Sequence, residues 1–470
     1  MSPEPAADPV RPTRPPSLLA GGQRRLLLGI VAVILLIAFE AMAVATAMPR
    51  AVGELHGLPF YAWAFSSYVV TSLFAMVVAG EICDARGPMR PLVAGVLLFT
   101  FGLLVAGTAV DMTVFIVGRA TQGLGGGAVI VALYVVVARA FDESLRPRVF
   151  AAMSSAWVLP SIVGPAVAGV VADRLSWRWV FLGVSVLVVP ALLMMLPSLP
   201  ALDGGSPTGR VGRKRAALMA AVGVGCLQYA GQRLDAVALG FLVVGVALVA
   251  PTVPRLLPRG TLRFARGLPT VIAMRGVLAG AFFGAETFVP LMLVTQRHLT
   301  ATEAGLALTG GAVGWSAGSW YQGRPATSTP RYALVRNGSL LVALAIAGVA
   351  LVLLPHVPAW GAGLAWTVGG VGMGMGMASV AVLMLQLSAP QDQGANSAAI
   401  QVADALFSAV FIGSAGVIYA VALRHGDNPS WAFALIDAVM VALALLGAAM
   451  AGRVVTSEPR LSPRLRQPAG

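Results

Sequence analysis

Four carboxylates of this sequence lie inside long apolar stretches, namely Glu40, Glu286, Asp404 and Asp437. Apolar surroundings disfavour the charged form of a carboxyl group, so such a group can bind and release a proton during a reaction cycle. That chemistry would suit a protein that couples its work to a flow of protons. Arg119 lies in a further apolar stretch, where a cation is costly unless it is paired or hydrated, and we therefore expect it to be functional.

The composition indicates why charges are so rare in these stretches. Of the 470 residues, 58% are hydrophobic and 11% are charged, and the mean hydropathy is +0.84. Soluble proteins carry roughly 25% charged residues, so a soluble enzyme, a disordered protein and a nucleic-acid-binding module are excluded. The two cysteines, Cys83 and Cys226, are too few for a disulfide framework or a zinc site. The chain is therefore predicted to cross a membrane many times.

The apolar stretches have the length of membrane-spanning helices, because about 20 residues are needed to cross a ~30 Å hydrocarbon core. They are continuous and too long to be strands of a barrel. We predict an all-α polytopic membrane protein with fourteen transmembrane helices, at residues 26–49, 60–82, 91–110, 113–138, 149–172, 178–199, 216–232, 236–253, 270–296, 303–322, 337–355, 360–388, 396–423 and 429–451.

Basic residues give the orientation of these helices, because Lys and Arg are retained on the cytoplasmic side. With the N-terminus inside, 24 of the 32 Lys and Arg residues fall on the inner side, six on the outer side, and Arg119 and Arg275 within spans. Both termini are therefore predicted to be cytoplasmic, and the net charge of +13 reflects topology rather than nucleic-acid binding. A very tight turn joins 216–232 to 236–253. If this pair lay on the surface the count would be twelve, but basic clusters on both sides favour fourteen.

The turn between the second and third predicted spans combines glycines with charges. Residues 80–90 read GEICDARGPMR, with Gly80, Asp84 and Gly87 followed by a basic residue. This pattern resembles the signature loop of the major facilitator superfamily, in which glycines permit a sharp turn and a carboxylate near cations can lock two helical bundles together. Three positions that are usually basic carry other residues here, so Arg86 and Arg90 would supply the charge. An ordinary cytoplasmic turn is the alternative.

Arg119 begins a second pattern, in which Gln122 and Gly123 follow at the spacing Arg-x-x-Gln-Gly. It resembles a signature of the same superfamily, and the resemblance implies a role for the arginine in proton coupling. The neighbouring glycines also look like a dinucleotide-binding fingerprint, but that fingerprint requires a preceding soluble strand. Helix packing through small residues explains Gly123, Gly125 and Gly127 without any ligand. It does not explain Arg119.

The fifth predicted span contains Pro160, Gly164, Pro165 and Gly169. The run Gly-Pro-x-x-x-Gly resembles the antiporter signature of exporters in this superfamily and so favours export over import. Pro165 removes a backbone hydrogen bond and kinks a helix, whereas Gly169 permits close contact with a neighbour. A kink with a purely structural role is the alternative.

The first predicted span ends with Glu40 nine residues before Pro49, which is similar to the first-span signature of drug:proton antiporters. Together with the central hairpin, the three signatures over residues 39–181 resemble the fourteen-span branch of that group. The resemblance implies a major facilitator fold of two six-helix bundles plus two extra central helices. Its segments are a disordered cytoplasmic tail at 1–25, an N-terminal bundle at 26–199, a basic loop, central hairpin and basic linker at 200–269, a C-terminal bundle at 270–451 and a cytoplasmic tail at 452–470.

Depth in the membrane predicts which charges meet. At ~1.5 Å per residue, Glu40 lies about 14 Å below Pro49, and Arg119 lies about 9 Å below Thr113 at the outer start of its span. We therefore predict an ion pair between Glu40 and Arg119. Arg275 lies about 16 Å along its helix from Glu286 and cannot pair with it.

Glu286 is surrounded in the sequence by aromatic residues, which suits a cationic or aromatic substrate. For each acid the alternative is a structural hydrogen bond. The predicted proton-coupling residues are Glu40, Arg119, Glu286 and Asp404. The predicted substrate cavity consists of Glu40, Gln122, Phe283, Glu286, Gln401 and Asp437.

These features predict a secondary transporter rather than an enzyme. A proton gradient would drive efflux of an amphipathic, drug-like compound by alternating access, with no cofactor, metal or ATP, since the sequence has no Walker A lysine motif. The alternatives are an exporter of an endogenous lipid or secondary metabolite, and a non-transporting receptor or scaffold, which would need no titratable interior. The expected partners are substrate, protons and bilayer, with no nucleic acid, for a monomer. The 31 arginines against one lysine suggest a bacterial plasma membrane.

Overall fold

The computed structural model describes residues 21–142, 145–199, 213–233, 236–324, 329–389, 393–424 and 430–454. Within these ranges every regular element is helical, as the sequence predicts. The helices of the first part of the chain are α1 (Gly21–Glu54), α2 (Trp63–Arg86), α3 (Met89–Gly107), α4 (Met112–Ala140), α5 (Arg146–Arg174), α6 (Arg178–Met195), α7 (Arg213–Arg233) and α8 (Ala236–Leu256). Those of the second part are α9 (Leu268–Glu286), α10 (Val289–Arg297), α11 (Ala301–Gly323), α12 (Arg331–Leu351), α13 (Gly361–Leu387), α14 (Gln393–Leu423) and α15 (Ser430–Met450).

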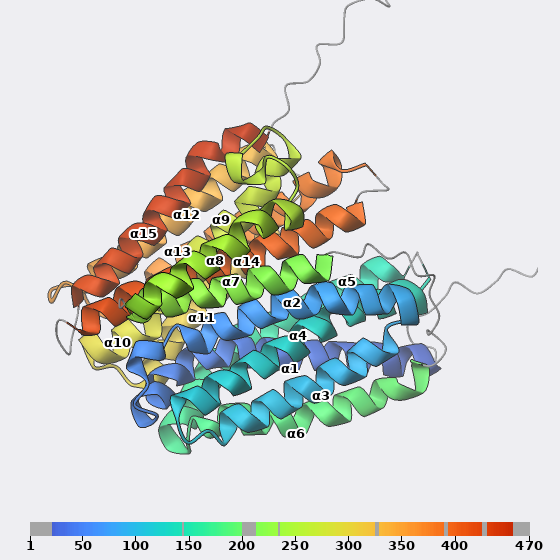
Figure 1. Ribbon diagram of the computed structural model, residues 1–470, viewed down its shortest axis with the longest axis horizontal. Coiled ribbons are helices and arrows are strands. Elements are labelled where there is room, and N and C mark those ends of the chain that lie inside the picture. The colour runs from blue at the N-terminus through green and yellow to red at the C-terminus, as the bar shows by residue number, and fades with distance from the viewer. Residues whose placement is uncertain are drawn as a thin grey trace, which may run out of the picture.

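The helices form two groups with a hairpin between them (Figure 1). Helices α1–α6, here called the N-terminal half, occupy the lower right of the view, and α9–α15, the C-terminal half, occupy the upper left. Helices α7 and α8 pack against each other and lie over the boundary. Two helical groups with an inserted hairpin are the arrangement that the sequence resemblance implies.

Among the described residues, twelve helical segments are long and apolar enough to cross a membrane. Helices α9 and α10 count as one of these, from Leu268 to Arg297, and α7 and α11 are not among the twelve. The predicted fourteen stretches are thus helical, but crossing by all fourteen is not confirmed. The predicted tails lie largely outside the described residues, although α1 already begins at Gly21, within the predicted tail 1–25.

Glycines allow α4 to approach its neighbours until the backbones touch. A Cβ atom on Gly125 would lie 2.2 Å from the backbone nitrogen of Phe99 in α3. A Cβ atom on Gly127 would lie 2.3 Å from the carbonyl oxygen of Ser72 in α2. Real contacts are longer than this, so only glycine fits. The interpretation of these glycines as helix-packing residues is confirmed.

Helix α13 has the same role in the C-terminal half. A Cβ atom on Gly370 would lie 1.9 Å from the carbonyl oxygen of Gly311, and one on Gly374 would lie 2.2 Å from that of Trp315. Both partners belong to α11, which packs along α13. One glycine-rich helix in each half therefore holds its neighbours at the distance that their side chains require.

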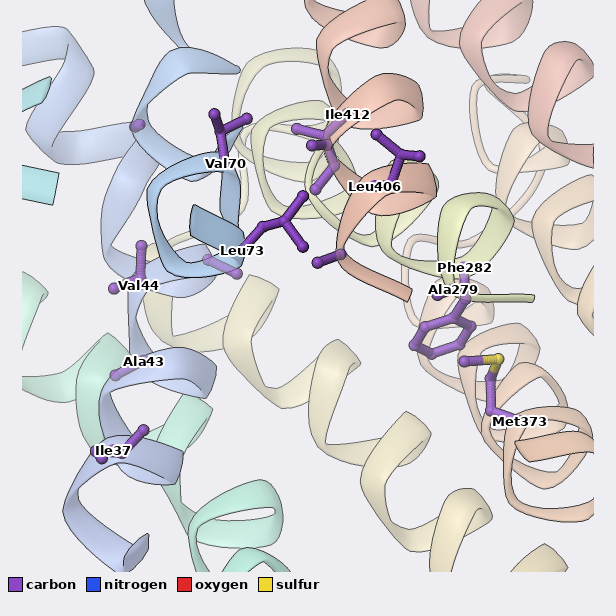
Figure 2. Close-up of a cluster of buried hydrophobic side chains, with 14 of the residues drawn as sticks. Ile37, Ala43, Val44, Val70, Leu73, Ala279, Phe282, Met373, Leu406 and Ile412 are labelled. Carbon is purple, nitrogen blue, oxygen red and sulfur yellow. The ribbon is translucent and has the colours of Figure 1, made fainter. Parts of the chain in front are cut away.

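The buried core continues from one half into the other (Figure 2). Val70 and Leu73 of α2 face Leu406 and Ile412 of α14 within a single apolar cluster. Side chains of α1, α9 and α13 extend the same cluster. The two halves are thus in direct apolar contact where α2 and α14 run side by side.

Helix α7 joins the halves through one polar side chain. Gln228 is buried, accepts a hydrogen bond of 2.7 Å from the Ser66 hydroxyl of α2 and donates one of 3.0 Å to the Ala409 carbonyl of α14. A Cβ atom on Gly413 would lie 2.5 Å from the Gln228 amide nitrogen, so α14 is shaped around this side chain. The hairpin therefore does more than fill space, since it bridges the halves.

Gly370→Ala should destabilise the protein, because the new methyl group would force α11 away from α13. Overpacking of this kind costs about 1–3 kcal/mol, which would lower the midpoint of thermal unfolding in detergent. Gly183→Ala in α6 is the matched control, because nothing lies within 4 Å of its Cβ position. The control should be neutral or slightly stabilising, since alanine favours helices over glycine by about 1 kcal/mol. Equal midpoints for the two variants would contradict the close-packing argument.

Candidate functional site

The predicted ion pair between Glu40 and Arg119 is present in the interior of the N-terminal half. The Glu40 side chain is fully buried, and Arg119 is 3% exposed. One terminal nitrogen of the guanidinium, Nη1, contacts Oε1 of Glu40 and donates a hydrogen bond of 2.6 Å to Oε1 of Gln122. Its Nε donates a hydrogen bond of 2.8 Å to the Ala64 carbonyl of α2. Helices α1, α2 and α4 therefore meet at one cation.

The Tyr68 ring covers this cation, with the Arg119 Cζ atom 4.8 Å from the ring centroid. Glycines of α4 make this possible, because a Cβ atom on Gly126 would lie 2.5 Å from the Tyr68 hydroxyl oxygen. One on Gly123 would lie 2.3 Å from the Tyr68 carbonyl oxygen. The same glycines that bring α2 to α4 thus place an aromatic face against the guanidinium.

The cluster leaves two polar atoms without partners. Within the described residues, Oε2 of Glu40 and Nε2 of Gln122 are buried and form no hydrogen bond. An ionised carboxylate can accept about four hydrogen bonds, so Glu40 uses only part of its capacity. Its second oxygen, Oε2, has no hydrogen-bond donor among the described residues.

A second ion pair, which the sequence analysis did not predict, lies in the C-terminal half. Nε of Arg275 in α9 lies 2.6 Å from Oδ2 of Asp404 in α14. Both side chains are about one fifth exposed, at 21% and 20%. The helical geometry excluded a partner for Arg275 on its own helix. Comparing its depth with that of Asp404 would have been the signal for this pair.

Glu286 lies in an aromatic cluster at the end of α9, together with Phe282, Phe283, Trp315 and Trp366. Trp366 of α13 donates a hydrogen bond of 3.3 Å to Oε1 of Glu286 and stacks on Phe282 with ring centroids 4.6 Å apart. Trp315 of α11 stacks against Phe283 at 6.4 Å. The aromatic neighbours expected from the sequence are present, and two tryptophans from other helices join them.

The helix that carries Glu286 breaks directly after it. Pro290 has no N–H and cannot donate to the carbonyl of Glu286 four residues earlier, so α9 ends and α10 begins at Val289. Tyr61 of the N-terminal half donates a hydrogen bond of 2.8 Å to the Thr287 carbonyl within this break. The environment of Glu286 is thus connected to the opposite half.

The remaining predicted cavity residues do not gather around one point in the contacts of the described chain. Asp437 of α15 is 5% exposed and has neither a hydrogen bond nor an ion pair to any described residue. Gln401 is exposed on α14, one helical turn before Asp404. Gln122 belongs to the Arg119 cluster.

The turn of residues 80–90 joins α2 to α3 as expected from its glycines. Gly87 adopts a φ of 87°, which favours glycine, and ends α2. Gly80 has only one atom near its Cβ position, at 4.0 Å. Asp84, Arg86 and Arg90 are exposed, and in the described part of the chain none of them forms an ion pair. A lock between bundles at this turn is not visible in this conformation.

Helix α5 carries the other predicted conformational motif, and it faces the C-terminal half. A Cβ atom on Gly169 would lie 2.5 Å from the Cα atom of Thr302, and one on Gly305 of α11 would lie 2.5 Å from the Pro165 carbonyl oxygen. Gly164 instead faces Met42 of α1 at 3.4 Å. Pro160 is buried within α5. The close contact expected of Gly169 is therefore made with α11.

Asp173, which lies next to this contact, connects the two halves. Asp173 at the end of α5 accepts hydrogen bonds of 2.9 and 2.5 Å from the backbone nitrogen and the hydroxyl of Thr302 at the start of α11. Its other oxygen lies 2.5 Å from Arg50 of α1. The sequence analysis missed this group because Asp173 lies at the edge of a predicted span. Together with the Tyr61–Thr287 hydrogen bond, it joins the halves at the end where α1 and α5 finish.

A comparison with protein families accounts for this architecture. Residues 30–414 match the model described as Major Facilitator Superfamily. The chain belongs to this superfamily. The expectation of a transporter rather than an enzyme agrees with this assignment.

Two relatives are named for drug transport. The chain is 27% identical over 305 residues to the multidrug transporter protein MdtP of Bacillus subtilis, covering 60% of this chain and 54% of that protein. It is 27% identical over 291 residues to the probable multidrug-efflux transporter Rv1634 of Mycobacterium tuberculosis, covering 58% and 60%. The chain thus matches little more than half the length of these relatives. The fourteen-span branch is not confirmed by these matches.

The fold is also found in solved structures. The crystal structure of an auto-inhibited POT family peptide transporter superposes with a TM-score of 0.68 at 15% identity, covering 95% of this chain and 99% of that chain. At this identity the likeness concerns the fold alone.

The buried pair of Glu40 and Arg119 allows a prediction about the stability of the protein. Glu40→Gln leaves a guanidinium that cannot be neutralised, so unfolding should become easier by about 3–5 kcal/mol. Arg119→Gln leaves a buried carboxylate without its cation, so this variant should be destabilised as well. The double variant should recover much of the loss. Thermal unfolding of all four proteins in detergent tests this, and additive single effects would contradict a direct pair.

Proposed function

We propose that this chain exports amphipathic, drug-like compounds, with lipophilic cations as the main class, in exchange for protons. The observation that carries the proposal is the buried cluster of Glu40, Arg119 and Gln122, in which one carboxylate oxygen is open. The names of the two drug-transporting relatives support the substrate class. The proton gradient, rather than a cofactor or ATP, would supply the energy.

Protonation of Glu40 would change the energy of the resting arrangement. The proton would neutralise the partner of Arg119, which would keep only the Gln122 oxygen, the Ala64 carbonyl and the face of Tyr68. A buried cation with an incomplete set of partners is costly. A rearrangement of α1 and α4 that hydrates or re-pairs Arg119 would then be favoured, so the proton biases the conformational equilibrium.

Glu286 and its aromatic neighbours would hold the cationic part of the substrate. A carboxylate beside Phe283, Trp315 and Trp366 offers both charge and aromatic faces to a lipophilic cation. The helix break at Thr287 lies next to this group, and interrupted helices commonly form the binding sites of transporters. Asp404 with Arg275, and the buried Asp437, are further candidates for proton exchange.

In alternating access, the two halves would separate at the end where α1 and α5 finish. The contacts of Asp173 with Thr302 and of Tyr61 with Thr287 would have to break in that step. With cytoplasmic termini, this end faces outward, and the conformation is closed to the outside. In this proposal α7 and α11 also cross the membrane, giving fourteen spans in a monomer of the bacterial plasma membrane.

Efflux of a fluorescent lipophilic cation from energised vesicles tests the proposal. Export by the wild type should collapse when the proton gradient is dissipated. Glu40→Gln should abolish gradient-driven export of every substrate. Glu286→Gln should raise the half-saturating concentration of the cation about tenfold, the loss expected for one desolvated cation contact, while a neutral substrate is less affected.

Asp142→Asn is the matched control, because Asp142 is an exposed acid beyond the end of α4. It should export like the wild type. No export across a broad dye panel, together with wild-type behaviour of both acid variants, would contradict the proposed function.

A further inference from the structure

A cavity of about 670 Å³ opens on the outer surface of the C-terminal half. Its walls come from α11 and α12, which both pack on α13, and its floor is formed by Val371 and Met375 of α13. We call this cavity the α11–α12 groove. It is separate from the Glu286 cluster, because Val371 is five residues after Trp366 and hence about 140° around the helix from it.

The side chains that line the groove are largely apolar and exposed. Trp320 of α11 is 66% exposed, and Leu340 and Leu344 of α12 are 44% and 63% exposed. Asn337 is the one amide side chain among its lining residues. A mostly apolar groove, with the Asn337 amide and the Tyr321 hydroxyl as its polar groups, fits a hydrocarbon chain that is attached to a polar linkage.

Basic residues gather at one end of the groove, where α11 ends and α12 begins. The Arg324 guanidinium lies 3.5 Å from the centroid of the Trp320 ring, which forms part of the wall. Arg336 is exposed one turn before Leu340, and Arg331 begins α12. The sequence has no Asp or Glu between Glu303 and Asp392, so α11, α12 and α13 supply no acid to these arginines beyond Glu303, at the far end of α11.

We propose that the α11–α12 groove binds one anionic phospholipid. Its phosphate would lie between Arg324 and Arg336, and Asn337 would bind an ester carbonyl of the glycerol backbone. One acyl chain would follow Leu340, Leu344 and Met375 towards the middle of the membrane. The proposal needs no assumption about the transported substrate, because the groove lies on the surface of the C-terminal half and is separate from the Glu286 cluster.

Fluorescence quenching by brominated lipids tests this site in the full-length protein reconstituted into phosphatidylcholine vesicles. The Trp320 signal is the difference between the wild type and Trp320→Phe. Brominated phosphatidylglycerol should quench this signal at a mole fraction on the order of tenfold lower than brominated phosphatidylcholine, as expected for two arginines near a headgroup. Arg324→Gln combined with Arg336→Gln should abolish the preference.

Two controls separate a site from general attraction. Trp360 is 68% exposed and precedes the first residue of α13, at the end of this helix that is away from the arginines. Its signal, isolated with Trp360→Phe, should show no preference for either lipid. Arg255→Gln combined with Arg259→Gln removes the same charge from exposed positions in the last turn of α8 and just after it and should leave the Trp320 preference intact. Equal quenching of Trp320 by the two lipids, or loss of the preference in this control variant, would overturn the proposal.

Discussion

The N-terminal half is organised around a cation that cannot lose its charge. Arg119 is 3% exposed within the membrane-spanning helix α4, and a guanidinium in that position must be surrounded by acceptors. Glu40, Gln122 and the Ala64 carbonyl supply them from three helices. Helix α2 must approach α4 closely to supply the Ala64 carbonyl. This close approach requires glycines in α4. The Arg-x-x-Gln-Gly motif and the glycines of α4 therefore meet the same requirement, which is to surround Arg119 with acceptors.

The C-terminal half also contains an arginine within a helix, but its ion pair is less enclosed. Its pair of Arg275 and Asp404 is one fifth exposed, so these two charges are less enclosed than Glu40 and Arg119. Its most enclosed acid, Asp437, has no partner in the described chain, and Glu286 has a tryptophan N–H rather than a cation. Neutral acids are compatible with such surroundings, whereas Arg119 keeps its counter-ion close. The two halves share a fold but differ in how their interior charges are paired.

The sequence allowed much of this to be predicted because helix periodicity and depth are local properties. The Glu40–Arg119 pair followed from counting residues down two spans, and the packing role of Gly123, Gly125 and Gly127 from their small size. The partners of Gln228 and Asp173 could not be found in this way, because they are a carbonyl of α14 and the start of α11. Such contacts depend on how the halves dock. Hydropathy likewise could not decide the span count, since α11 is rich in Gly, Ser and Thr and lies against α5 and α13.

The contacts between the halves connect the two acids that matter most for the proposed cycle. Tyr61 begins the segment that leads into α2, whose Ala64 carbonyl binds Arg119, and its hydroxyl reaches the helix break beside Glu286. A movement of α2 that follows a change at Glu40 must therefore pull on the Thr287 carbonyl or release it. Release would leave that carbonyl without its donor at the moment when the joined end opens. In the proposed cycle, this hydrogen bond would make the surroundings of Glu286 depend on the state of Arg119, which is the dependence that coupled exchange requires.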